Sequence, residues 1–399
     1  MFKKRGEIQK YRGFFAQRRE LIATSTLIGT IVGAGMLGIP YAVAKAGLLY
    51  GLLLIIVMGG VFLFLNLMLG EIVLRTKEQH QLTGYAEKYL GPRGKRLMTL
   101  VMFLSLYGAL TAYLLGEGFA LHAIFKFGSP ILYTGLFFFL TLGIVWRGIK
   151  STGKAELYLI FLLLIVVAVI GFVSLNKIES HNLTWANPGS LFLPYGVIMF
   201  ALLAFPAIPE MQEELGTKKK YFKKSIIIGS IIPVLLYLLF TFIVVGSIGQ
   251  EKFSLLEPNQ RIATIALSIY TYPLLGLFAN LLAVLAMFTS FLSLSTALIE
   301  MYELDYHLSR LAGFVLTFAL PLIIVLTNVT SFIAILGITG GIAGGLEGIC
   351  LIQMYRGAKK RGNREPEYSL PSQRFLWIVL TLLFALGMIY ELGIIFHFI

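Results

Sequence analysis

Two short stretches rich in glycine and proline are the parts of the sequence best suited to bind a small zwitterion. They are residues 33–40 (GAGMLGIP) and 204–210 (AFPAIPE), and each lies inside a long apolar run. Glycine lowers the cost of leaving helical geometry, and proline removes a backbone donor. A helix broken there exposes N–H groups, which suit a carboxylate, and carbonyl groups, which suit an ammonium group or a metal cation. Because Gly33, Ala34 and Gly35 offer N–H groups with almost no side chain, the sequence predicts that an α-amino acid binds there.

A second group of residues has the oxygen atoms that a monovalent cation needs. The spacing of Ala286, Thr289 and Ser290 puts one carbonyl and two hydroxyls within one helical turn. Gly29 and Val32 lie just before the first break, where their carbonyls are partly freed. Neutral oxygens alone are a weak set for Mg²⁺, and they predict a sodium site. The alternative is that Thr289 and Ser290 bond back to their own helix.

Carboxylates within apolar segments are costly in a bilayer, so each is a functional candidate. Glu71, in LGEIVLRT, either accepts N–H groups freed by the second break or is solvated beside Arg75. Glu117 lies deeper in its apolar segment and is either a structural hydrogen-bonding group or a proton carrier. Glu213 and Glu214 follow the second break, and we expect both to be solvated.

The apolar segments that carry these residues predict an all-α integral membrane protein. Of the 399 residues, 57% are hydrophobic and 13% are charged, about half the charged fraction of a soluble globule. A span of the hydrocarbon core takes about 20 helical residues. The sequence predicts eleven spans, at about 21–46, 48–75, 97–125, 130–148, 155–175, 190–214, 225–249, 262–299, 310–327, 329–355 and 373–398.

The positions of the two breaks predict an internal repeat. Each break lies in the first span of a five-span block, which indicates two inverted repeats, 21–175 and 190–355, after a basic arm at 1–20. The eleventh helix, 373–398, is appended to them.

The basic residues follow a membrane pattern. The formal net charge is +13, but Lys and Arg cluster in alternate loops, which argues against nucleic acid as a partner. We therefore expect a multi-pass protein of the cell membrane with a cytoplasmic N-terminus and an extracytoplasmic C-terminus. The single cysteine, Cys350, excludes an intramolecular disulfide and is expected to pack as a small hydrophobe. The sequence has no HExxH, GxSxG or Walker-type motif, so neither a catalytic residue nor a cofactor is expected beyond a coupling Na⁺.

Three segments resemble a known group of transporters. Residues 24–47 (TSTLIGTIVGAGMLGIPYAVAKAG) are similar to the first helix of the amino acid/auxin and aromatic amino acid permeases. Residues 200–214, with the KKKYFKKSIIIGSIIP that follows at 218–233, resemble the sixth helix, basic loop and seventh helix. Residues 289–308 (TSFLSLSTALIEMYELDYHL) resemble the eighth helix of tyrosine/tryptophan permeases. These families belong to the amino acid–polyamine–cation superfamily, which has the LeuT-type fold.

The resemblance implies roles for individual residues. It implies a substrate carboxylate at Gly33, Ala34 and Gly35, and it matches Tyr113 to a pocket tyrosine of the fold, four residues before Glu117. Ordinary packing between helices is the alternative for Tyr113. The carbonyls that the resemblance assigns to the substrate's ammonium group are those of Ile31, Phe200, Ala201 and Leu203. The oxygens of Gly29, Val32, Ala286, Thr289 and Ser290 match the sodium site shared across the fold, although the aromatic permeases are regarded as proton-coupled.

Together these observations predict a secondary transporter that carries a neutral, aromatic or large hydrophobic amino acid with Na⁺ or H⁺. Two other classes stay open. A non-transporting amino acid sensor on the same fold would normally have a longer effector-binding extension than the arm of about twenty residues before the first span. A membrane-embedded transferase would need a cluster of His, Asp or Cys at a span end, which the sequence lacks.

Overall fold

The computed structural model describes residues 19–148, 153–371 and 374–395, and this part of the chain is helical, without strands. The predicted basic arm lies outside the described residues, except for Arg19 and Glu20. The helices are α2 (Arg19–Ile31), α3 (Gly35–Ala46), α4 (Leu48–Leu74), α5 (Leu82–Phe125), α6 (Pro130–Trp146), α7 (Gly153–Ser174), α8 (Leu193–Leu202), α9 (Ala207–Leu215), α10 (Phe222–Ser254), α11 (Ala263–Tyr270), α12 (Pro273–Asp305), α13 (Arg310–Leu326), α14 (Phe332–Ile338), α15 (Gly345–Arg361) and α16 (Arg374–Ile395).

The described helices are those of a multi-pass membrane protein. Seven are long and apolar enough to cross a bilayer, and an eighth span is gained when the bent pair α2–α3 counts as one. Shorter apolar helices occupy three more of the predicted positions, at Pro130–Trp146, Tyr158–Ser174 and Arg310–Leu326. Large apolar side chains face outward on peripheral helices, as with Phe139 (71% exposed), Phe172 (80%) and Phe375 (80%). Such a surface suits lipid; the exact number of eleven spans stays a prediction.

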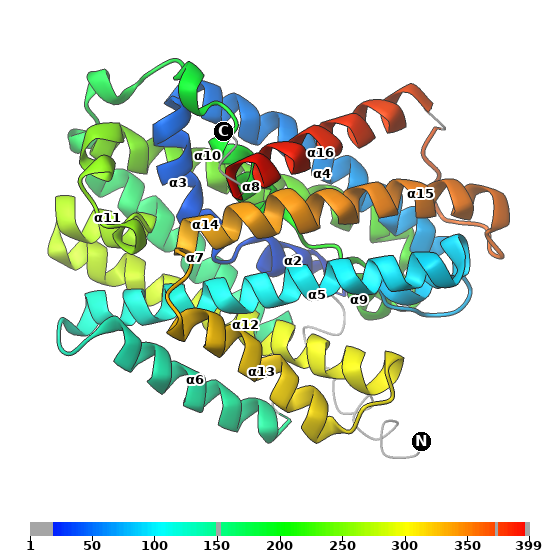
Figure 1. Cartoon of the computed structure of the whole chain (residues 1–399). Coiled ribbons are helices and arrows are strands. Elements are labelled where there is room, and N and C mark those ends of the chain that lie inside the picture. Colours follow the sequence, from blue (N-terminus) through cyan, green and yellow to red (C-terminus); the bar gives the residue numbers. More distant parts are fainter. Residues whose placement is uncertain (1–18, 149–152, 372–373, 396–399) are drawn as a thin grey trace.

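Both predicted breaks are present. The first separates α2 from α3, which are bent by 49°, and the second separates α8 from α9 at residues 203–206. The half-helices pair across the molecule, because α2 packs on α9 and α3 packs on α8. In Figure 1, α2 lies at the centre of the molecule with α5 running across it, so the breaks lie deep inside the bundle.

Three predicted span boundaries can be compared with the structure. Residues 82–96, predicted as loop, form the first part of α5, which is interrupted by a turn at Gly91 (φ 78°). The predicted span at 262–299 is two helices, α11 and α12, because Pro273 cannot donate a backbone hydrogen bond and starts a new helix. The predicted division at Thr327-Asn328 is confirmed, since α13 ends at Leu326 and Asn328 has a φ of 50°.

Two basic segments, one before α10 and one after α15, lie against the ends of α2 and α4. Lys224 Nζ lies 2.8 Å from Glu20 Oε1, which places the lysine-rich segment before α10 beside the first helix. Arg364, after α15, donates to the carbonyl of Leu74 at 2.7 Å. Both basic segments therefore lie at helix ends; the side of the membrane that they face stays a prediction.

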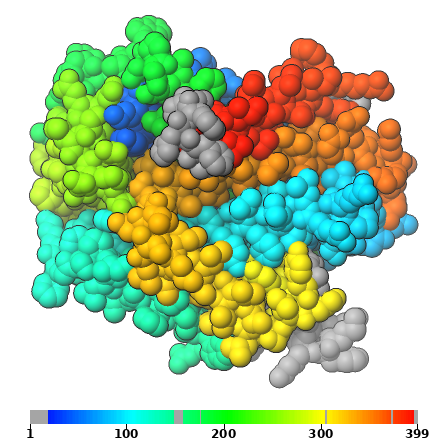
Figure 2. Space-filling model, viewed as in Figure 1, coloured from blue at the N-terminus to red at the C-terminus, as the bar shows by residue number. Residues whose placement is uncertain are grey.

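A glycine-rich π-helical segment, η6 (Thr339–Gly344), joins α14 to α15. A Cβ on Gly340 would lie 1.9 Å from the carbonyl oxygen of Gly196 and 2.4 Å from the amide nitrogen of Phe200. Only glycine allows the backbones of η6 and α8 to come this close. The contact holds the start of α15 against the broken span, and it brings Glu347 on α15 toward the break. Figure 2 shows this face of the molecule, with the cyan atoms of α5 and the orange atoms of α14 and α15 across its middle.

Candidate functional site

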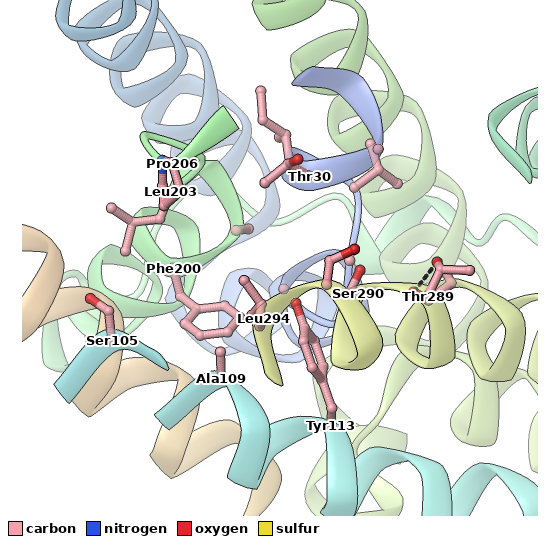
Figure 3. A pocket seen from close by; sticks show the side chains of 18 of the residues that line it. Thr30, Ser105, Ala109, Tyr113, Phe200, Leu203, Pro206, Thr289, Ser290 and Leu294 are labelled. Atoms are coloured by element: carbon pink, nitrogen blue, oxygen red, sulfur yellow. Dashed lines mark hydrogen bonds between the residues drawn. The ribbon is translucent and has the colours of Figure 1, made fainter. Parts of the chain in front are cut away.

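A cavity lies between the two breaks, among α2, α5, α7, α8, α12 and α15 (Figure 3). The predicted residues among its lining are up to 261 positions apart in the sequence, from Gly29 to Ser290. The predicted residues that line it are Gly29, Ile31, Val32, Gly33, Gly35, Tyr113, Phe200, Ala201, Leu203, Ala286, Thr289 and Ser290. Ala34 is fully buried next to them but does not line the cavity.

The first break frees two carbonyls of α2. In an α-helix, each N–H donates to the carbonyl four residues earlier. Here Gly33 donates instead to Ile31 O at 3.0 Å, and Met36 donates to Gly33 O at 3.3 Å. The carbonyls of Gly29 and Val32 therefore lose their helical donors. Both belong to the predicted cation site.

The same break leaves donors at the start of α3. The helix begins at Gly35. Met36 donates to Gly33 O and Leu37 to Ala34 O, so the N–H groups that remain for a ligand are those of Ala34 and Gly35. They suit a carboxylate, as the sequence predicts. The N–H of Gly33 is different, because it is already used within the break.

The second break frees carbonyls on α8. Pro206 has no N–H, so the carbonyl of Leu202 lacks its helical donor. Ala207 donates to Ala204 O at 3.0 Å, which leaves the carbonyl of Leu203 without its own. Leu203 is one of the residues predicted to hold an ammonium group.

Tyr237 on α10 links the two breaks, and the sequence analysis missed it. Its hydroxyl lies 2.6 Å from Ile31 O and 2.9 Å from Ala201 O, and the side chain is fully buried. The hydroxyl has one hydrogen, which the two carbonyls share. The predicted ammonium acceptors Ile31 and Ala201 are therefore partly occupied by this tyrosine. Only the long-range fold brings Tyr237 here, so no local pattern identifies it.

Gly33 and Gly35 face different neighbours. A Cβ on Gly35 would lie 2.4 Å from the Cα of Ala201, so this glycine allows the backbones of α3 and α8 to cross. A Cβ on Gly33 would lie 3.0 Å from Tyr113 Oη and 3.6 Å from Ser290 Oγ. Figure 3 shows Tyr113 and Ser290 pointing toward the same part of the cavity. Gly33 therefore faces the polar end of the cavity, and Gly35 faces the helix crossing.

The hydroxyl of Thr289 bonds to its own helix. Oγ1 lies 3.1 Å from Ala286 O and 3.3 Å from Leu285 O (Figure 3). This is the local alternative that the sequence leaves open for this residue. A hydroxyl has two lone pairs besides its hydrogen, so Thr289 can also offer oxygen to a cation.

Glu71 has neither of the two predicted environments. It is fully buried and not solvated. Its carboxylate receives hydrogen bonds from Arg75, Lys359 and Leu370 N at 2.7 Å each, from Tyr355 at 2.9 Å and from Ser369 at 3.1 Å. Glu71 therefore braces α4 against α15 and the segment before α16, and not the second break. Apart from Arg75, its partners lie almost 300 residues away, beyond the reach of a local pattern.

Two other carboxylates can be placed. Glu117 is fully buried outside the cavity lining, and both its oxygens lack a hydrogen-bond partner within the described ranges. Of the two residues predicted to be solvated, Glu213 is exposed, but Glu214 is partly buried. Glu214 accepts hydrogen bonds from Thr26 Oγ1 at 2.9 and 3.0 Å, because α9 packs on α2.

Glu347 was missed by the sequence analysis and lines the cavity. It is 5% exposed, and its Oε1 accepts a hydrogen bond from Ser105 Oγ at 2.7 Å. The available signal was a glutamate within an apolar, glycine-rich segment, TGGIAGGLEGIC.

Comparison with known proteins gives a consistent result. The sequence profile of the tryptophan/tyrosine permease family matches residues 17–391. The tyrosine-specific transport system 1 of Haemophilus influenzae is 27% identical over 336 residues, which cover 80% of this chain and 83% of that protein. The glutamine transporter 2 of Aliivibrio fischeri is 26% identical over 79% of this chain and 82% of its own length.

A solved structure has the same fold. The crystal structure of MhsT in complex with L-phenylalanine aligns with a TM-score of 0.68 at 16% identity. The alignment covers 94% of this chain and 98% of that one. The predicted LeuT-type architecture is thereby confirmed.

Proposed function

Because the chain belongs to the tryptophan/tyrosine permease family, and is thus an amino acid transporter and not an enzyme, we propose that it carries a neutral amino acid with an aromatic or large hydrophobic side chain. In this proposal a cation moves with the substrate across the cell membrane by alternating access. The observation that supports the proposal best is the cavity between the two helix breaks.

The two charged groups of an amino acid have complementary partners at the breaks. The carboxylate is held by N–H groups at the start of α3, at Ala34 and Gly35, where the helix dipole favours negative charge. The ammonium group is held by carbonyls at the end of α8, chiefly those of Phe200 and Leu203. Tyr237 keeps the two breaks in register through Ile31 and Ala201.

The rest of the cavity favours an apolar side chain. Leu106, Ala109, Leu163, Phe200 and Leu294 line it. Displacing water from such a surface stabilises an apolar side chain by about 25 cal/mol per Å² of buried area. The relatives named as transporters of tyrosine and tryptophan suit this environment.

We assign the coupling role to Na⁺ bound next to the substrate. Gly29 and Val32, whose carbonyls are freed by the break, line the same cavity as Ala286, Thr289 and Ser290. Five neutral oxygens match a monovalent cation. A proton carried by Glu117 is the competing mechanism.

Uptake into proteoliposomes tests the proposal. Proteoliposomes that contain the purified protein are given an inwardly directed sodium gradient or, separately, a pH gradient. Accumulation of labelled tyrosine, tryptophan and glutamine inside them is measured. We expect concentrative uptake of an aromatic amino acid with sodium alone. Uptake driven only by the pH gradient would replace sodium by the proton, and binding without uptake under either gradient would identify a sensor.

The proposed orientation places the N-terminus in the cytoplasm. The segment from Lys218 to Lys224 lies beside Glu20, and loops rich in lysine stay inside. Lys220 should therefore be protected from a membrane-impermeant amine reagent applied to intact cells. Labelling of Lys220 from outside would reverse the topology.

A further inference from the structure

One carboxylate in the cavity has no part in holding the amino acid's backbone groups. Glu347, at the start of α15, receives a hydrogen bond from Ser105 on α5 at 2.7 Å. Its second oxygen, Oε2, has no hydrogen bond to the residues that the structure describes. Of the described residues that line the cavity, Glu347 is the only carboxylate, and none is Lys, Arg or His.

The position of Glu347 relative to the breaks follows from its partner Ser105 on α5. Ser105, Ala109 and Tyr113 are spaced by four residues on one face of α5 and point into the cavity (Figure 3). Eight helical residues rise about 12 Å. Tyr113 lies beside Gly33, at the backbone end of the substrate site, so Ser105 and Glu347 lie at the far end. The ring of Phe200 and the methyl group of Ala109 lie between (Figure 3).

This order of groups matches one kind of substrate. From the break outward, the cavity offers partners for a zwitterion, then an apolar section, then a hydrogen-bond acceptor. The extended length of an aromatic amino acid plus one hydrogen bond is about 10 Å, which is comparable with the separation along α5.

We propose that Glu347 accepts a hydrogen bond from an O–H or N–H group at the tip of the substrate's side chain, and that it thereby selects phenol- or indole-bearing amino acids over wholly apolar ones. This inference rests on the proposed function, since it assumes that the amino acid lies in this cavity. Ser105 is the positioning residue, because its hydroxyl fixes one oxygen of Glu347 and leaves the other for the substrate.

The size of the selection follows from the cost of an unpaired acceptor. An ionised carboxylate accepts hydrogen bonds and has no hydrogen to donate. Phenylalanine would cover Glu347 without supplying a donor, whereas the hydroxyl of tyrosine supplies one. Hydrogen bonds to charged groups in proteins correspond to about a 10- to 150-fold difference in affinity.

The test is equilibrium competition binding to the purified full-length protein. Two ligand pairs are compared. Tyrosine is compared with phenylalanine, and tryptophan is compared with its benzothiophene analogue, in which sulfur replaces the indole N–H. We expect the wild type to prefer the donor-bearing member of each pair at least 10-fold.

Four variants identify the acceptor. Glu347→Met should bring both ratios close to one while changing phenylalanine affinity less than about threefold, since methionine keeps the volume and removes the acceptor. Glu347→Gln, which keeps a carbonyl acceptor, should retain part of the preference, as should Ser105→Ala. Glu391→Gln is the matched control, because Glu391 is a buried carboxylate (4% exposed) on α16 outside the cavity lining, and it should leave both ratios unchanged.

The outcomes separate this inference from the proposed function. If the wild type binds no amino acid, the proposed function fails. If it binds tyrosine and phenylalanine equally, or if Glu347→Met keeps the wild-type ratios, only the role of Glu347 is overturned. Equal loss of tyrosine and phenylalanine binding in both Glu347 variants would also overturn it. So would stronger competition by lysine than by tyrosine, since a cationic substrate would then be the partner of this carboxylate.

Discussion

Removing the hydroxyl of Tyr237 should weaken substrate binding although this residue is not proposed to touch the substrate. Tyr237→Phe deletes the donor that lies 2.6 Å from Ile31 O and 2.9 Å from Ala201 O. Ile31 O keeps the N–H of Gly33 at 3.0 Å, so the carbonyl of Ala201 loses most. An unsatisfied buried acceptor costs about 1–3 kcal/mol.

This cost should appear as an affinity change of about 5- to 150-fold, because the two breaks lose the group that keeps them in register. The assay is equilibrium binding of labelled tyrosine, with thermal unfolding measured in parallel. Tyr89→Phe is the matched control: Tyr89 is 1% exposed and bonds to Thr76 Oγ1 at 2.7 Å, away from the breaks. That control should lose stability but keep its affinity. Wild-type affinity for tyrosine in Tyr237→Phe would show that this hydroxyl does not keep the two breaks in register.

Three further perturbations have distinct expected results. Gly35→Ala should destabilise the protein by about 1–3 kcal/mol through overpacking against α8. Gly33→Ala should fold normally and bind substrate more weakly. Equal melting temperatures for the two variants would contradict this contrast. Glu71→Gln should cost about 3 kcal/mol, because Arg75 and Lys359 lose a buried partner, with tyrosine affinity retained in the folded fraction. Replacing Thr289 and Ser290 together by alanine should weaken sodium binding sharply, and tyrosine should tighten sodium binding in the wild type by the same factor as sodium tightens tyrosine; unchanged sodium dependence in the double variant would argue for a proton.

The sequence predicts the features that depend on local chemistry. The helices are interrupted at residues 32–34 and 203–206, at the two stretches rich in glycine and proline, because these residue types act within one turn. The turn at Asn328 is likewise local. The predicted cation and substrate residues converge because α2 packs on α9 and α3 packs on α8, which brings the two breaks together. The length and apolar composition of the segments are enough to indicate a membrane protein.

The features that the sequence does not reveal depend on distant partners. Glu71 was expected at the second break or in water, but its partners Tyr355 and Leu370 come from the far end of the chain. Tyr237 is one of several aromatic residues in the largely apolar helix α10, and its role is visible only when Ile31 and Ala201 lie beside it. Residues 271–272 interrupt a predicted single span, because apolar composition alone does not locate the end of a helix.

The most direct test of the central claim is an experimental structure of the protein with bound tyrosine and sodium. We expect the carboxylate of tyrosine on the N–H groups of Ala34 and Gly35, the ammonium group at the carbonyl of Leu203, and the phenol directed toward Glu347. Sodium should lie between the carbonyl of Val32 and the hydroxyls of Thr289 and Ser290. Tyrosine bound elsewhere, or bound in this cavity with its carboxylate directed away from α3, would contradict the account.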